Sequence, residues 1–366
     1  MRVPLKLFLI ILFISNNITA SSFSVMTLNT QNLFDIYDDI GKDDKAYLPF
    51  EKKQNPEHKK SCNRIKVKSW RNECLYLDWD QETQDAKLQN LVSLITSYQK
   101  GGADILALQE VENIKILEQL FNLLEPFGYI DFKLLESIDR RGIDTAYISK
   151  YSLFDPKLHY VKFSSEFSKR DTRPIFEVSL NINNQIIKLY NVHFPSNYLP
   201  TEMRIESFNT LNILISQHDY PSIALGDFNL TNIDDKRYQV YANQMNKWTV
   251  AHYAGCKSCI GTYYYKPKKS WDFLDTILVA KGRGIEFEKK SIDVFKNKFS
   301  LYGDTNKPYR FDSSTKKGVS DHFPMVAKIR LDWSLFSPAT TIEYSKVGKL
   351  VMLREINNFT VIAWLN

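Results

Sequence analysis

The chain has 366 residues, which is enough for one large domain or two modest ones. Apolar residues make up 43% of it and charged residues 25%, and this balance excludes a wholly disordered chain. The net charge of +6 suits a polyanionic partner but does not establish one, because many basic proteins bind no nucleic acid.

The first 20 residues have the pattern of a secretory signal peptide. Arg2 and Lys6 flank the start of a short apolar run at 7–14, and small residues follow at 20–22. The run is too short to span a bilayer comfortably, and no Cys follows it to carry a lipid. We therefore expect cleavage near Ala20, a secreted or periplasmic protein, and no membrane span after cleavage. A membrane anchor or a buried first strand is the alternative.

Apolar patterns then predict strands interspersed with a few helices. Strands are expected at about 23–28, 104–108, 145–149, 176–182, 186–192, 222–225, 273–279 and 323–329, and helices at about 88–95, 116–124 and 205–215. The polar stretch at about 36–84 is long for a loop within a domain, and such loops are usually functional or mobile. The mixture predicts an α/β or α+β fold with helices covering a β core.

The four cysteines fit an oxidising compartment. Cys62 and Cys74 lie in one polar segment, and Cys256 and Cys259 form a C-x-x-C. Half of a zinc site and a redox pair are the alternatives for the C-x-x-C, but the sequence lacks the second Cys/His pair or the strand-to-helix context that these need. We expect disulfides between sequence neighbours, Cys62–Cys74 and Cys256–Cys259, which is one of three connectivities.

Polar residues recur where predicted strands end. They are Asn29, Glu110, His193, Asp227 and Asn229. Gly226-Asp227-Phe228-Asn229 places a carboxylate and an amide on the same side of an extended segment, where they could orient a water and donate to an oxyanion. Taken singly, these positions have alternatives: an Asx-turn for Asp227 and Asn229, a helix start for Glu110, and a core histidine for His193. We expect these strand ends to converge at one edge of the β core.

Two further acidic positions join this set. Asp275 lies in a predicted strand, and the tripeptide Ser320-Asp321-His322 precedes another. An Asp beside a His can ligate a metal through its carboxylate while the imidazole handles a proton. A surface Asp-His pair is the alternative, since the tripeptide alone is a weak signal.

The ordered set of segments resembles the endonuclease/exonuclease/phosphatase superfamily, which includes pancreatic-type deoxyribonucleases, apurinic-site endonucleases, neutral sphingomyelinases and inositol-polyphosphate phosphatases. The matching segments run in the family's order from about residue 23 to 331: TLNTQNLFD, ILALQEVEN, GIDTAYISK, RDTRPIFEV, LYNVHFPSN, ALGDFNLT, WDFLDTILVA and GVSDHFPMV. One segment is a weak signal, whereas the ordered set is a strong one.

The resemblance implies a four-layer α/β/β/α sandwich of two mixed sheets flanked by helices. It places a catalytic domain at 21–332, with the polar insertion at about 36–84, and leaves 333–366 as a C-terminal extension of unknown role. The insertion with its two cysteines, and the segment CKSCIGTYYY, look like those of bacterial exported members of the superfamily.

The resemblance also implies Mg2+-assisted attack of water on phosphorus, with Mn2+ or Ca2+ as alternative ions. Asn29, Glu110 and Asp321 match metal ligands. Asp227 and Asn229 match the groups that place the water and steady the phosphoryl group.

Two imidazole–carboxylate pairs are implied in the same way. His193 matches the histidine of the nuclease branch and Asp144 the carboxylate that orients it, while Asp275 is expected to orient His322. One pair can accept a proton from water and the other can protonate the leaving oxygen. A carboxylate partner fixes the tautomer of each imidazole and raises its basicity.

Arg173 matches the phosphate-binding arginine of this branch, and a planar guanidinium suits that task. Asn197 matches a second phosphate contact, with its alignment shifted by one residue. His159 and His252 fall outside the ordered set, and we expect both to be structural.

Aromatic and basic residues outside the set leave two interpretations open. Trp70, Trp79 and the tyrosines of 263–265 could stack on bases, although packing is the commoner role. The lysines at positions 266, 268 and 269 could track phosphates, although a solvated turn is the commoner role.

We expect a monomeric, exported, Mg2+-dependent endonuclease that hydrolyses DNA, with RNA as a further substrate. Basic charge, the histidine pairs, Arg173 and the export signal favour this function. A sphingomyelinase-like phospholipid phosphodiesterase is the first alternative. A toxin-subunit or binding role on the same fold is the second.

Overall fold

The computed structural model describes residues 22–168, 172–331, 350–356 and 359–364. The expected signal peptide at 1–20 and much of the expected C-terminal extension at 333–366 lie outside these ranges. Within that extension, β16 (Leu350–Ile356) and β17 (Phe359–Trp364) pair as an antiparallel hairpin. No helix in the described ranges is both long and apolar enough to cross a membrane.

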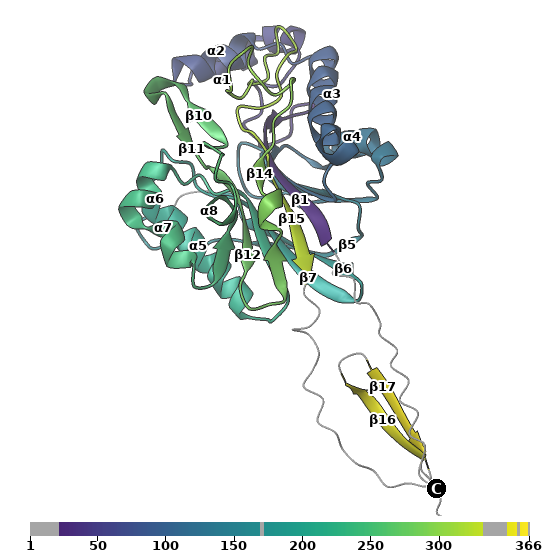
Figure 1. The fold of residues 1–366 in the computed structure, drawn as a ribbon. Helices are drawn as coiled ribbons and strands as arrows, with labels where there is room; N and C mark the ends of the chain where they lie inside the picture. The colour runs from purple at the N-terminus through teal and green to yellow at the C-terminus, as the bar shows by residue number, and fades with distance from the viewer. Residues whose placement is uncertain (1–21, 169–171, 332–349, 357–358, 365–366) are drawn as a thin grey trace, which may run out of the picture.

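Two mixed sheets form the centre of the molecule (Figure 1). The first has the order β13-β15-β1-β2-β4-β3, with β14 also pairing with β15. Its strands are β1 (Ser22–Leu33), β2 (Ile105–Val111), β3 (Asp131–Leu134), β4 (Asp144–Ser149), β13 (Ile285–Phe287), β14 (Asp293–Val294) and β15 (Met325–Leu331). Strands β1 and β2 are parallel, and the other pairs are antiparallel.

The second sheet has the order β5-β6-β7-β8-β12-β9. Its strands are β5 (Leu153–His159), β6 (Ile175–Ile182), β7 (Gln185–His193), β8 (Ser222–Asp227), β9 (Trp248–Val250) and β12 (Asp275–Ala280). Here β7 and β8 form the parallel pair. A separate hairpin joins β10 (Tyr263–Tyr265) to β11 (Ser270–Asp272).

Helices cover the outer face of each sheet (Figure 1). The first sheet carries α3 (Gln81–Ser97) and α4 (Ile114–Leu124), and the second carries α5 (Thr201–Ser216), α6 (Asn232–Tyr238) and α7 (Val240–Gln244). Asn113 starts α4, because its Oδ1 accepts the backbone N–H groups of Lys115 and Ile116. Removing such a cap costs about 1 kcal/mol.

Three apolar clusters separate the four layers. Between the sheets, Val25 and Ile105 of the first pack in one cluster with Leu189, Leu225 and Ile277 of the second. A second cluster fills the space between the first sheet and helices α3 and α4, and a third does the same for the second sheet and α5. The predicted four-layer α/β/β/α sandwich is therefore confirmed.

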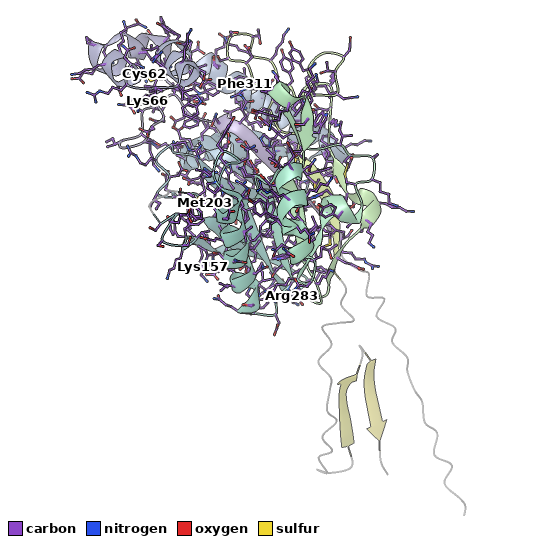
Figure 2. All side chains as sticks on the ribbon, turned by 90° about the vertical axis from the view of Figure 1, so that its left-hand side faces the viewer. Cys62, Lys66, Lys157, Met203, Arg283 and Phe311 are labelled. Atoms are coloured by element: carbon purple, nitrogen blue, oxygen red, sulfur yellow. A yellow bond between two sulfur atoms is a disulfide. The ribbon has the colours of Figure 1, made fainter. Side chains whose placement is uncertain are left out.

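The polar insertion contains regular structure, although its composition suggested an irregular loop. It folds into the short helices η1 (Phe50–Gln54), α1 (Pro56–Cys62) and α2 (Lys68–Tyr76). The Cys62–Cys74 disulfide joins α1 to α2 with a Cα–Cα distance of 5.6 Å, and Cys256 bonds to Cys259, so the predicted pairing is confirmed. Figure 2 shows Cys62 and Phe311 toward one end of the molecule and Lys157 and Arg283 toward the other.

Candidate active site

The predicted site residues gather where strands of both sheets end. Asn29 lies in β1 and Glu110 in β2, while His193 ends β7, Asp227 ends β8 and Asp275 begins β12. In the second sheet His193 is the register partner of Asp227, which is also the partner of Asp275. The Nδ2 of Asn29 donates to Glu110 Oε1 at 3.1 Å and to Asp227 Oδ2 at 3.2 Å, so one amide bridges the two sheets.

Irregular backbone in β2 aims the Glu110 side chain. The register of β2 against β4 shifts between Gln109 and Val111, and Glu110 has a φ of 63°. A non-glycine residue in this left-handed region is uncommon, and such strain clusters at functional positions. The shift leaves Glu110 facing Asn29, while the side chain of Gln109 donates to Asn191 between the sheets at 2.8 Å.

Gly226 allows the parallel strands β7 and β8 to approach closely. Its φ is 148°, and a Cβ at this position would lie 2.0 Å from the carbonyl oxygen of Val192. A larger residue would push the strands apart, and the register that sets His193 beside Asp227 would be disturbed.

Asp227 lies at the centre of the cluster. Its Oδ1 accepts the backbone N–H of Asn229 at 2.8 Å, and Asn229 in turn donates from its side chain to Phe194 O at 3.1 Å. Burial and the nearby Asp275 carboxylate raise the pKa of Asp227 to about 7. A buried carboxyl with this pKa can accept a proton near neutral pH.

The predicted Asp275–His322 pair is present. His322 Nδ1 and Asp275 Oδ2 are 2.7 Å apart, and both side chains are buried. Burial alone would lower the pKa of His322, but the Asp275 charge and hydrogen bond raise it to about 10. The imidazole is therefore protonated at neutral pH and can hold or deliver a proton.

The predicted Asp144–His193 pair is not formed. The Asp144 carboxylate instead accepts the backbone N–H of Ser137 at 3.2 and 3.3 Å, and burial raises the pKa of Asp144 to about 6. His193 Nδ1 is buried without a hydrogen-bond partner among the described residues. Its Nε2 faces Asp227 Oδ2 at 3.7 Å and Glu110 Oε1 at 3.9 Å. Burial and the Arg173 charge hold the pKa of His193 well below its usual value.

Arg173 is buried behind His193. Its Nε donates to His193 O at 3.2 Å, its Nη2 donates to Phe194 O at 2.9 Å, and its Nη1 lies 3.5 Å from Asp139. The guanidinium thus fixes the backbone that carries His193, and its role toward phosphate stays a prediction. Asn197 is partly exposed in the segment before α5, and no hydrogen bond joins it to the other site residues described.

Two residues at this site were missed in the sequence. Arg310 Nη1 lies 3.5 Å from Asp321 Oδ2. Ser320 Oγ donates to Asn29 O at 2.7 Å and accepts the backbone N–H of His322, so it joins β1 to the Asp-His segment. The position of Ser320 in its tripeptide was a usable signal, whereas nothing in the sequence near Arg310 indicates its partner.

The aromatic candidates separate into packed and peripheral residues. Trp79 is buried and donates its indole N–H to Phe34 O, so it is structural, whereas Trp70 is exposed. Tyr263 borders the site, because its ring centroid lies 4.9 Å from that of His322. His252 is hydrogen bonded to Thr276 Oγ1 and burial lowers its pKa to about 3, in keeping with a structural role.

The donor set fits a divalent cation. Ligand atoms of Asp227, Asp275 and His322 lie within 4.8 Å of one another, and Asp275 Oδ1 is buried without a hydrogen-bond partner among the described residues. Because the imidazole of His322 is protonated, the two carboxylates are the donors of this group. Carboxylate oxygens crowded in this way favour a hard cation, and Mg2+ prefers such ligands. Asn29, Glu110 and Asp321 stay the predicted ligands, and the contact of Asn29 with Glu110 brings two of them together.

Three solved structures are similar to the chain over most of its length. An endonuclease/exonuclease/phosphatase family protein from Bacteroides thetaiotaomicron is 13% identical, with 86% of this chain and 99% of that chain covered and a TM-score of 0.55. A humanised D. rerio TDP2 with 14 mutations is 13% identical, covering 84% and 98%, with a TM-score of 0.52. A mannosyl-6-phosphatase from B. thetaiotaomicron VPI-5482 is 14% identical, covering 84% and 99%, with a TM-score of 0.52.

At these identities the structural likeness shows the fold alone. Comparison with curated protein sequences gave no match. The sequence model of the Endonuclease/Exonuclease/phosphatase family matches residues 75–331, which is well over half of the chain. The matched region contains Glu110, His193, Asp227, Asp275 and His322. The chain therefore belongs to the endonuclease/exonuclease/phosphatase family.

Proposed function

We propose that the chain is an exported, Mg2+-dependent phosphodiesterase that hydrolyses DNA, with RNA as a further substrate. Members of its family are generally metal-dependent phosphoesterases. The observation that carries the chemistry is the pair of contrasting histidines beside Asp227. His322 is held protonated by Asp275 at 2.7 Å, while burial and the charge of Arg173 lower the pKa of His193 and keep it neutral.

These residues divide the work of hydrolysis. A bound Mg2+ would supply charge neutralisation at the phosphoryl oxygens. Asp227 would orient the attacking water and take its proton, and Asn29 holds the Asp227 carboxylate in place through the 3.2 Å hydrogen bond. His322 would steady the phosphoryl group or protonate the leaving oxygen, because Asp275 keeps its Nδ1 hydrogen bonded and leaves Nε2 free to face the substrate.

A basic hairpin beside the site favours a nucleic acid over a lipid. Tyr263, at the start of β10, forms an isolated bridge with His322, and the hairpin turns at Lys266, Lys268 and Lys269, all of which are exposed. A lysine-tipped hairpin suits a run of phosphates, whereas docking into a lipid surface needs an apolar or aromatic tip. The half-buried Tyr264 packs on Trp271 at 5.2 Å and so is not a free apolar tip.

Export is proposed from the sequence of the first 20 residues and is supported by the two disulfides. Structural disulfides persist in oxidising compartments and are rare in the cytosol.

The chemistry is tested with purified full-length chain and four substrates: plasmid DNA, RNA, sphingomyelin and mannose 6-phosphate, each with Mg2+ or EDTA. We expect nicking of plasmid with Mg2+ and none with EDTA. His322→Gln is expected to abolish it, and His159→Gln, a histidine variant outside the site, is the matched control. Intact plasmid together with cleaved sphingomyelin or mannose 6-phosphate would refute the nuclease proposal.

The role of the hairpin is tested by replacing Lys266, Lys268 and Lys269 with alanine. We expect a higher KM for plasmid and a salt dependence of binding that is shallower by about 3 in log–log slope, one for each lysine that no longer neutralises a phosphate. Hydrolysis of a small diester, bis(p-nitrophenyl) phosphate, is expected to stay unchanged. The double variant of the exposed pair Lys289 and Lys290 is the control. If the hairpin variant and the control variant change KM and the salt dependence equally, the hairpin does not contact DNA.

A further inference from the structure

A second group of carboxylates lies outside the active site, where the polar insertion begins. Oxygens of Asp39, Asp44 and Glu112 lie within 4.8 Å of one another. The other compact groups of metal-ligating side chains in the described ranges are accounted for. Two of them contain disulfide-bonded cysteines, and one is the active-site group of Asp227, Asp275 and His322.

Two of these carboxylates have a buried oxygen without a partner. Asp44 and Glu112 are each 1% exposed, and Asp44 Oδ1 and Glu112 Oε1 accept no hydrogen bond from any described residue. Within the described part of the chain, no Lys, Arg or His nitrogen lies within 4.0 Å of the carboxylates of Asp39, Asp44 or Glu112. Buried, unpaired carboxylates are costly unless a cation or a shared proton compensates them.

Hydrogen bonds hold the remaining oxygens in a fixed arrangement. Asp44 Oδ2 accepts the backbone N–H of Asp39 at 2.7 Å, and Glu112 Oε2 accepts that of Asp35 at 2.7 Å. Asn113 Nδ2 links Asp35 Oδ2 at 3.1 Å to Asp39 Oδ2 at 3.2 Å. Each carboxylate is therefore positioned through one oxygen, and in Asp44 and Glu112 the second oxygen is left for another ligand.

The basic side chains that the structure describes near the group do not contact these free carboxylate oxygens. Lys42 lies in the same segment, but its Nζ donates to the carbonyl oxygens of Ser137 and Asp139, both at 3.0 Å. Arg140 pairs with the exposed Asp43 instead, at 3.9 Å. Asp38 adds a further negative charge beside Asp44. Among the described residues, the local charge is strongly negative and no basic side chain pairs with these carboxylates.

We propose that Asp39, Asp44 and Glu112 bind a structural Ca2+ ion, with Asp35 and Asn113 as positioning residues. An all-oxygen set from separate chain segments suits Ca2+, which accepts six to eight oxygen ligands in flexible geometry, whereas Mg2+ demands a near-ideal octahedron and keeps its waters. The ion would join the 35–44 segment to the end of β2. That segment also holds the 137–140 loop, because Asp43 N donates to Arg140 O at 2.6 Å. This proposal is independent of the substrate.

Equilibrium dialysis of the full-length chain against 45Ca2+, after removal of metal with EDTA, tests the site. Asp44→Asn and Glu112→Gln are each expected to bind one Ca2+ fewer than the wild type. Asp43→Asn, an exposed carboxylate in the same segment, and Glu110→Gln, in the active site, are expected to keep that ion. Equal uptake by Asp44→Asn, Glu112→Gln and wild type, or no uptake by Glu110→Gln, would overturn the proposal.

Thermal melting of the wild type supplies a readout that does not depend on the folding of a variant. At a 100-fold excess over its dissociation constant, Ca2+ is expected to raise the Tm of the EDTA-treated chain by about 5 °C. The same rise is expected in Glu110→Gln, because the proposed ion lies outside the active site. A Tm that does not respond to Ca2+ in Glu110→Gln would mean that the carboxyls share protons, and the proposal would be wrong.

Discussion

Two histidine–carboxylate pairs in this protein have the same nitrogen–oxygen distance and different surroundings. His322 lies 2.7 Å from Asp275 at the meeting point of the two sheets, and His159 lies 2.7 Å from Glu177 between β5 and β6. Glu177 also pairs with Lys188 at 2.7 Å, so each of its oxygens faces a nitrogen. The Asp275 carboxylate has one oxygen without a partner among the described residues and lies beside Asp227.

We expect charge balance, and not the distance between two side chains, to separate a reactive pair from a structural one. We call the Glu177 group closed, because nitrogen atoms of the protein face both oxygens of its carboxylate. In the group of Asp275, His322 and Asp227, the charge of His322 faces one oxygen of Asp275, while the other oxygen of Asp275 lies beside the Asp227 carboxyl and is left for a ligand from outside, such as a divalent cation. The predictions below test this contrast.

The largest expected effect is on hydrolysis. Asp275→Asn removes the charge that raises the pKa of His322, so the imidazole is no longer held protonated at neutral pH. We expect kcat/KM to fall about 1,000-fold, as for loss of a general acid. Glu177→Gln is the matched control and is expected to stay within about twofold of wild type, the size of a small barrier change. Steady-state rates on plasmid DNA or a small diester measure both, and equal losses would contradict the contrast.

For the free energy of unfolding, we expect the larger effect in Glu177→Gln and the smaller one in Asp275→Asn. Glu177→Gln leaves the buried Lys188 without its closest partner, and we expect the free energy of unfolding to fall by about 2 kcal/mol. Asp275→Asn removes one of two crowded carboxylates, and the imidazole left behind can release its proton, so without metal a smaller loss is expected. Urea unfolding monitored by circular dichroism in EDTA measures both. A larger loss in Asp275→Asn would show that its pair is also structural.

Of the two histidine–carboxylate pairs, only the one of Asp275 and His322 is expected to respond to metal. Mg2+ should raise the Tm of the EDTA-treated wild type by a few degrees, because a ligand that binds only the native state stabilises it. The rise is expected to disappear in Glu110→Gln and to persist in Glu177→Gln. Differential scanning calorimetry at fixed protein concentration gives both values, and a Glu110→Gln chain that still responds fully would remove Glu110 from the ligand set.

The smallest expected effect is the pH dependence of the closed group. Burial opposes ionisation of Glu177, but hydrogen bonds from His159 and Lys188 outweigh it and lower its pKa from 4.5 to about 2. Because the folded-state pKa is depressed, the stabilisation is fully present above pH 4.5 and is lost as the pH falls toward 2. The stability difference between wild type and Glu177→Gln should therefore shrink over this window in urea titrations. If the stability difference stays constant with pH, the stabilisation does not come from ionisation of Glu177.

Much of the fold and many of the site residues were predictable. Apolar runs stop at Glu110, His193 and Asp227, within one residue of the observed strand ends, whereas β1 continues past Asn29 to Leu33. The order of these segments along the chain indicated the family. The local pairing Cys62–Cys74 could be predicted because short sequence separation limits the alternatives. The helices within the insertion were not predicted, because polar, lysine-rich composition hides short helices that are held by a disulfide.

Side-chain partners were the least predictable feature. Asp144 was expected to orient His193, yet its carboxylate accepts the backbone N–H of Ser137, which lies 7 residues earlier in the chain. Glu112 accepts the backbone N–H of Asp35, 77 residues away, and no local pattern marks Asp321 as the partner of Arg310.

The sequence by itself determined the longer strands and helices and which chemical groups stand at or near the strand ends, because apolar periodicity is encoded within short windows. The layer order followed from the resemblance of the ordered segments to a known family. Only the tertiary structure decided which carboxylates are matched by cations and which are left in excess. That balance is summed over contacts between distant segments, as in Asn29 bridging to Asp227 and Glu112 meeting Asp44, and no short window of sequence contains it.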